Sequence, residues 1–151
     1  MRYVVDGYNL LFRLLSPDDK IDYYRESLIK ILIRLSEEKK LRLTLVFDAH
    51  HRKEGGYRTH KGTVEIVYTD QGQTADAYIL EHLQSETIVV TSDNHLARHV
   101  KNSGYQTISN EKFIKLIKPA KTPISDKSSI YLHDKFFEYY LNAFESNLDS
   151  E

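Results

Sequence analysis

RYVVDGYN, at residues 2–9, places an apolar run of strand character directly before an aspartate and a turn. The same arrangement recurs as LTLVFD at residues 43–48 and as TIVVTSD at residues 87–93. Segments with helical spacing of apolar residues lie between these runs. Strands that alternate with helices are typical of a parallel sheet covered by helices on both faces. The sequence therefore predicts an α/β fold in which aspartates follow the strands.

The periodicity assigns most of the chain to regular elements. The expected strands are 3–6, 43–47, 63–68, 87–91 and 106–108, and the expected helices are 9–15, 21–40, 74–84, 93–103 and 111–118. Residues 49–62 hold three glycines and many charged groups, which indicates a polar loop. Residues 118–129 have a linker composition, and an aromatic stripe at helical spacing follows. We expect a domain at 1–118, then a linker and C-terminal helix at 119–151 that packs on the domain or on a partner.

The composition narrows the class of protein. The 151 residues suffice for one domain with a real core, and the net charge of −1 does not by itself demand a polyanion partner. The absence of cysteine excludes disulfides and thiolate metal sites, and it fits a reducing cytoplasm. No apolar run is long enough to cross a bilayer, so we expect a cytoplasmic protein without a membrane partner.

Four aspartates are expected at one edge of this sheet. Asp6, Asp48 and Asp93 follow apolar strand-like runs, and Asp76 falls in the first turn of a predicted helix. Ligands of open parallel sheets bind at the carboxyl ends of the strands. Carboxylates gathered there repel one another unless a cation neutralises them. All-oxygen ligands suit Mg²⁺ or Mn²⁺, so the pattern indicates a divalent-metal site for chemistry on a phosphate.

Each aspartate also has a purely structural interpretation. Asp93 suits a helix N-cap, Asp76 suits the first turn of a helix, and Asp6 and Asp48 suit turns. Zinc would instead prefer histidine ligands. His95 and His99 share a helix face, but they lack the glutamate context of a zinc protease.

The segments VVDGYNLLF, LVFDAHHR, KGTVEIVYT, GQTADAYI and VVTSDNHLARH occur in the order in which they stand in NYN domains. Over about residues 2–117 the chain resembles these members of the PIN-like nuclease superfamily, most closely the YacP-like branch. The resemblance implies a PIN-like three-layer α/β/α sandwich with a mostly parallel central sheet. It also implies a Mg²⁺- or Mn²⁺-dependent endoribonuclease that acts in RNA decay or processing.

The resemblance assigns roles to the motif residues. Asp6, Asp76, Asp93 and Asp48 would hold one or two cations, and Asn9 follows Asp6 in the DGYN turn. Thr91 and Ser92 could orient waters or ligands beside Asn9. The expected reaction is metal-assisted hydrolysis that leaves a 5′ phosphate and a 3′ hydroxyl. Two positions depart from the YacP-like pattern: Leu80 stands where an acidic residue is frequent, and Ala97 where a glutamine is frequent.

The predicted loop at 49–62 supplies an RNA-binding patch. Its basic and aromatic side chains can neutralise phosphates and stack a base, and the residues in question are Arg52, Lys53, Tyr57, Arg58 and Lys61. A solvated loop without a ligand is the alternative. The expected partner is single-stranded RNA, an mRNA or a processing intermediate, with the ribosome and the oligomeric state left open.

Two other functions compete with this one. The first is an RNA-binding or scaffold protein that keeps the fold and cleaves weakly or not at all. The second is an aspartate-based phosphatase, in which a second aspartate two residues after the nucleophile acts as general acid. Tyr8 occupies that position here, which disfavours the phosphatase.

Overall fold

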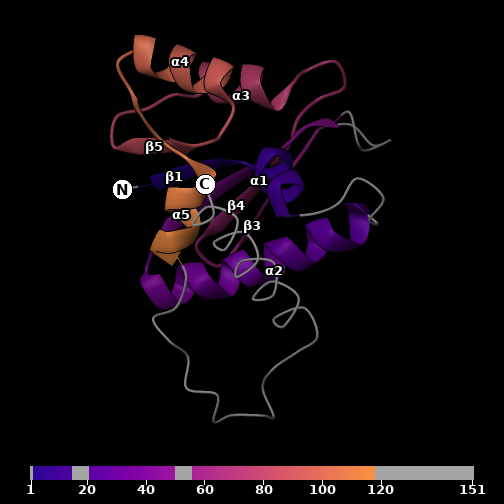
Figure 1. The fold of residues 1–151 in the computed structure, drawn as a ribbon. Coiled ribbons are helices and arrows are strands. Elements are labelled where there is room, and N and C mark those ends of the chain that lie inside the picture. The colour runs from indigo at the N-terminus through magenta and orange to yellow at the C-terminus, as the bar shows by residue number, and fades with distance from the viewer. Residues whose placement is uncertain (1, 15–20, 50–55, 118–151) are drawn as a thin grey trace, which may run out of the picture.

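The structure is a computed structural model that describes residues 2–14, 21–49 and 56–117 (Figure 1). The strands are β1 (Arg2–Asp6), β2 (Arg42–Phe47), β3 (Tyr57–Lys61), β4 (Val64–Tyr68), β5 (Thr87–Val90) and β6 (Gln106–Ile108). The helices are α1 (Gly7–Leu14), α2 (Ile21–Lys39), α3 (Ala75–Glu81), α4 (Asn94–Asn102) and α5 (Asn110–Ile117). The predicted C-terminal helix and linker lie outside the described residues.

One mixed sheet forms the centre of the fold. Its strand order is β3-β4-β2-β1-β5-β6, and every neighbouring pair is parallel except β3 with β4. Helices lie on both sides of this sheet, with α3 and α4 above it and α2 below it in the view of Figure 1. The predicted α/β/α arrangement with a mostly parallel sheet is therefore confirmed.

The two faces of the sheet bury different cores. The face beneath α1, α2 and α5 carries the larger core, in which Val5, Leu45 and Phe47 are fully buried. The face beneath α3 and α4 carries a smaller aliphatic core that includes Val46 and Val89. Alternate residues of a strand point to opposite faces, so the apolar runs seen in the sequence serve both cores.

The strand β3 corrects the predicted loop at 49–62. Residues 57–61 pair antiparallel with β4, and Gly62 forms the turn between them with φ +62°. A left-handed backbone of this kind favours glycine. The sequence pattern did not predict this strand, because its side chains are mostly exposed and charged. An edge strand of this kind does not need alternating apolar residues.

The strand order reverses direction at β1. The chain adds β2 and β4 on one side of β1 and then adds β5 and β6 on the other side. The helix α1, which follows β1, packs on the same face of the sheet as α2. The helix α4, which follows β5, covers the opposite face. In open α/β sheets such a switch point leaves a crevice outside the carboxyl ends of the strands. Asp6 ends β1 and Asp93 follows β5, so both stand at this crevice.

Gly7 carries the turn out of β1, and a side chain there would overlap the buried ring of Phe47. We expect Gly7→Ala to lower the free energy of unfolding by about 1–3 kcal/mol, because a close-packed core resists added volume. Denaturant unfolding of Gly7→Ala, Phe47→Leu and the double variant measures this effect. The double variant should lose less than the sum of the single losses. Strict additivity would show that Phe47 is not the obstacle.

Candidate active site

Asp6 is the most buried of the four predicted aspartates. It ends the central strand β1 with 7% of its surface exposed. The backbone N–H of Asn9, in the first turn of α1, donates a hydrogen bond to its carboxylate. The direct passage from β1 into α1 therefore supplies a donor that the buried carboxylate needs.

The other three aspartates are held by the elements that follow β2, β4 and β5. Asp48 follows β2, and its Oδ2 accepts a hydrogen bond of 3.2 Å from the backbone N–H of Ala75. Asp76 lies one residue further along α3 and is partly buried. Asp93 caps α4, because its Oδ1 accepts a bond of 2.9 Å from the N–H of His95. The structural role expected for Asp93 is confirmed, and it leaves Oδ2 without a hydrogen-bond partner among the described residues.

The charges of the four carboxylates affect the pKa values of Asp6 and Asp76. Burial raises the pKa of Asp6 from the ordinary 3.8 to about 7, and the charges of Asp76, Asp93 and Asp48 add to this increase. The N–H of Asn9 opposes it. Burial also raises the pKa of Asp76, again with help from Asp93 and Asp48. Asp6 and Asp76 are therefore each within electrostatic range of the other carboxylates.

The aspartates at the carboxyl edge of the sheet are not arranged as a metal coordination shell in this structure. Within the described parts of the chain, no three Asp, Glu or His side chains stand close enough together to hold a metal ion. The donor set nevertheless fits a hard divalent cation, because it consists of carboxylate oxygens under mutual repulsion. His95 and His99 lie on α4 with ring centroids 5.6 Å apart, and each lowers the pKa of Asp76.

The side chain of Asn9 connects the turn after β1 to the turn after β5 and to the start of α5 through hydrogen bonds. Its Oδ1 accepts three hydrogen bonds: 3.0 Å from the N–H of Ser92, 3.3 Å from Thr91 Oγ1 and 2.8 Å from Asn110 Nδ2. Thr91 Oγ1 in turn accepts a bond of 3.1 Å from the N–H of Asp93. The turn after β1 is thus locked to the turn that carries Asp93.

Sequence reasoning missed the part of this network that α5 supplies. Asn110 is fully buried, and its backbone N–H donates to Ser92 Oγ. Its Oδ1 has no hydrogen-bond partner among the described residues. Ser92 Oγ donates to Glu111 Oε2 at 3.0 Å, and Glu111 lies 4.0 Å from Arg13. The only signal was an Asn-Glu pair at the start of a helix, and such pairs are common as caps and first-turn acids.

The structure divides the predicted RNA-binding residues. Arg52 and Lys53 lie outside the described residues. Tyr57 is 55% exposed and packs against Tyr68, with ring centroids 6.1 Å apart. Lys61 is exposed on the same strand face, because alternate residues of β3 share a face. Arg58 lies on the other face, where it donates to the hydroxyl of Tyr78 at 2.6 Å.

Asp6→Asn should stabilise the metal-free protein at high pH. Protonated Asp6 contributes native-state stability that is fully present below pH 3.8 and is lost as the pH rises to about 7. At about 1.4 kcal/mol per pH unit, the loss is on the order of 2–4 kcal/mol above pH 7. The variant escapes this loss. Its advantage should therefore be largest above pH 7 and vanish near pH 4.

Unfolding by denaturant at several pH values in EDTA measures this difference. Glu38→Gln is the control, since Glu38 is exposed on α2 and its side chain makes no hydrogen bond or ion pair with the described residues. A stability difference between Asp6→Asn and the unchanged protein that does not vary with pH would contradict the raised pKa of Asp6.

The comparisons with known proteins identify the family and the fold. The profile of the YacP-like NYN domain matches residues 3–146, and it runs past the point near residue 117 where the recognisable motifs end. The chain belongs to the YacP-like NYN domain family. This family is part of the PIN-like nuclease superfamily, so membership implies a nuclease-type protein that acts on RNA.

Solved structures of Rae1 (YacP) from Bacillus subtilis share the fold. One has a TM-score of 0.59 at 18% identity and covers 99% of this chain and 84% of that chain. A point mutant of the same protein has a TM-score of 0.58 at 18% identity, with coverage of 97% and 99%. No functionally curated protein gives a significant match. Within the described residues, none of the helices has the length and apolarity that a membrane crossing requires.

Proposed function

We propose that this protein is a metal-dependent endoribonuclease that hydrolyses phosphodiester bonds of single-stranded RNA in the cytoplasm. The observation that carries the proposal is the mutual electrostatic effect of Asp6, Asp48, Asp76 and Asp93 at the switch point of the sheet. Such repulsion lowers stability, and folded proteins retain it mainly where a ligand relieves it. Membership in the YacP-like NYN family supports the same activity.

The four aspartates would hold Mg²⁺ or Mn²⁺. Asp6 and Asp93 are the proposed principal ligands, since one is buried at the centre of the crevice and the other keeps Oδ2 unbonded. Asp48 and Asp76 complete the set from β2 and α3. When bound, the cation would supply Lewis acidity, which lowers the pKa of water and neutralises charge at the phosphate.

The neighbouring polar residues position this set. Asn9 holds Asp6 through its backbone N–H and holds the Asp93 turn through its side chain. Thr91 and Ser92 connect Asn9 to Asp93 and to α5. Ligand carboxylates oriented in this way lose less freedom when the cation binds, so the network favours a defined geometry.

Single-stranded RNA is the proposed substrate, as an mRNA or a processing intermediate, with the ribosome as a further partner. Tyr57 and Lys61 offer an exposed ring and a cation on one face of β3. Tyr57 pairs with Tyr68 at the end of β4, whereas Lys61 pairs with Val64 at its start, so only the ring lies at the edge where β2 and β4 end. Stacking and charge neutralisation together are typical of single-strand binding without sequence preference.

A second candidate is an RNA-binding scaffold that does not cleave. It is favoured by the lack, among residues 2–14, 21–49 and 56–117, of three side chains placed to hold a cation. The aspartate-based phosphatase has no such support. Tyr8 stands where that mechanism needs its acid, and its hydroxyl accepts a buried hydrogen bond from Arg25.

A cleavage assay separates these functions. Single-stranded RNA with a 5′ label is incubated with the protein and Mn²⁺, with added EDTA, or with Asp6→Asn or Asp93→Asn. We expect cleavage only by the unchanged protein with Mn²⁺, and at least a hundredfold lower rate for either variant, because each loses a ligand charge. The control variant Glu38→Gln should cleave normally.

The products and the binding data complete the assay. Fragments with a 5′ phosphate and a 3′ hydroxyl are expected. RNA binding without cleavage under any divalent cation would favour the scaffold. Release of phosphate from small esters, with RNA left intact, would favour the phosphatase.

Removing the ring of Tyr57 should weaken RNA binding. Stacking of a base on an aromatic ring contributes about 1–3 kcal/mol, so Tyr57→Ala should lower affinity about tenfold, while Tyr57→Phe should retain it. Fluorescence anisotropy with labelled single-stranded RNA in EDTA measures the affinity without cleavage. Tyr23 on α2 has the same 55% exposure and provides the matched control. Equal losses for Tyr57→Ala and Tyr23→Ala would place the RNA elsewhere.

A further inference from the structure

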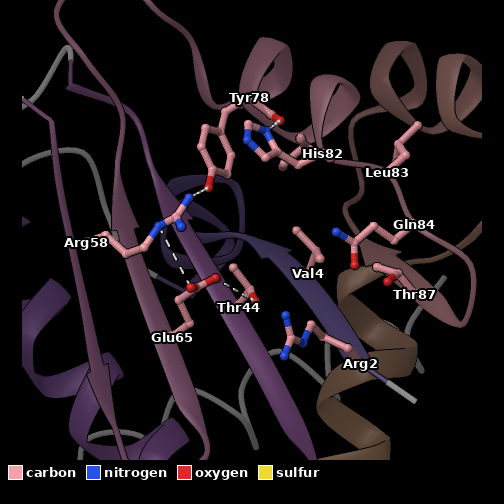
Figure 2. Close-up of a pocket in the computed structure, with 11 residues that line it drawn as sticks. Arg2, Val4, Thr44, Arg58, Glu65, Tyr78, His82, Leu83, Gln84 and Thr87 are labelled. Carbon is pink, nitrogen blue, oxygen red and sulfur yellow. Dashed lines mark hydrogen bonds and ion pairs between the residues drawn. The ribbon is translucent and has the colours of Figure 1, made fainter.

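A pocket of about 160 Å³ opens on the α3 face of the sheet, beside the first halves of the strands (Figure 2). It exists because α3 is short. Seven helical residues rise about 10 Å, whereas the six residues of β2 extend about 20 Å. The helix therefore covers the sheet near the aspartates and leaves the opposite half of the same face open.

The floor of this pocket is polar where a parallel sheet is normally apolar. Val4, Thr44 and Glu65 are cross-strand neighbours on β1, β2 and β4. The Glu65 side chain is only 16% exposed, yet its contacts are long. Its Oε1 accepts from Thr44 at 3.4 Å, and its Oε2 lies 3.3 Å from His60 and 3.8 Å from Arg58. A carboxylate can accept about four hydrogen bonds, so Glu65 retains acceptor capacity.

Donors without partners line another side of the pocket. The side chains of Arg2 and Gln84 make no hydrogen bond or ion pair with any described residue. Figure 2 shows the guanidinium of Arg2 and the amide of Gln84 extending toward the space in front of Val4 and Thr44. Arg58 differs from Arg2 because the hydroxyl of Tyr78 and the carboxylate of Glu65 already engage it.

These groups select a neutral ligand that both donates and accepts. Glu65 would repel an anion, and Arg2 would repel a cation. Val4 and Leu83 add apolar surface suited to the face of a ring. The volume lies below the 300–1,000 Å³ of sites for drug-sized ligands, so it suits one small ring system.

We propose that this pocket binds a single nucleobase, with guanine preferred. Guanine offers N–H donors on its Watson–Crick edge to Glu65 and the acceptors O6 and N7 to Arg2, the side-chain type that most often reads those acceptors. Uracil, cytosine and adenine each provide fewer of these partners at once.

The pocket and the aspartates lie on one face of the sheet. Arg2, Val4 and Asp6 alternate along β1, so all three point to the face that α3 covers. Val4 precedes Asp6 by two residues, which is about 7 Å along the strand. A base held in the pocket would therefore belong to the same RNA strand that reaches the aspartates, with α3 between the two places. This last step depends on the proposed nuclease function, whereas base binding itself does not.

Titration of guanosine 5′-monophosphate in EDTA, followed by amide chemical shifts, tests the pocket without any cleavage. We expect saturable shifts at the pocket residues Arg2, Thr44, Glu65 and Gln84, and weaker binding of the other three nucleoside monophosphates. Arg2→Ala and Glu65→Gln should each lower the affinity for guanosine monophosphate at least tenfold. Arg42→Ala is the matched control, because Arg42 pairs with Arg2 in the sheet but does not line the pocket. The affinity of this variant for guanosine monophosphate should change less than twofold.

Competition by RNA identifies the source of the base. Displacement of the nucleotide by a guanine-containing single strand, and not by oligouridine, supports a base of the RNA strand. Saturable binding that no RNA displaces supports the same pocket as a site for free nucleotides. Failure of every nucleotide to shift the pocket residues, or equal effects of Arg2→Ala and Arg42→Ala, overturns the proposal. Neither failure affects the cleavage assay, so the two proposals stand or fall separately.

Discussion

Burial of one carboxylate at the end of the central strand is the constraint on which the site depends. Asp6 is nearly inaccessible to water, and three further carboxylates raise its pKa. A buried charge needs hydrogen-bond donors or an opposite charge, because its desolvation is unfavourable. The N–H of Asn9 supplies one donor, and a divalent cation would supply the opposite charge. The turn after β1 meets this requirement in part, and the proposed hard metal would complete it.

The two faces of the sheet bury side chains of different size and polarity, which is consistent with the same constraint. The core beneath α1, α2 and α5 holds the large aromatic and aliphatic side chains, including Phe47 and Phe113. The core beneath α3 and α4 is smaller and purely aliphatic among its fully buried members. Stability therefore comes mainly from one face. The other face can accommodate polar groups such as Asp6, Thr44 and Glu65.

Sequence patterns predicted the parts of this fold that local chemistry dictates. Thr74 and Asp93 cap α3 and α4, and each accepts the N–H expected of an N-cap. The placement of Asp6, Asp48 and Asp93 after strands followed from strand direction, since parallel strands end at one edge. Site roles for these residues stay predictions until metal or RNA is bound.

Other parts depend on contacts between distant segments, and no local pattern encodes them. β3 forms because its backbone completes the edge of β4, although its side chains resemble those of a loop. Asn110 enters the site because β6 ends beside β5, which brings the start of α5 against Asn9. The pocket arises from a mismatch in length between α3 and the strands beneath it. Such features follow from the assembled sheet and not from any one segment.

The bond between Asn9 and Asn110 joins residues 101 positions apart. At about 5–20 residues per second of synthesis, some 5–20 s separate the appearance of the two partners. A nascent chain thus has its first aspartate long before the asparagine that completes the lock. A chain still being translated would lack an ordered site until almost the whole domain is made.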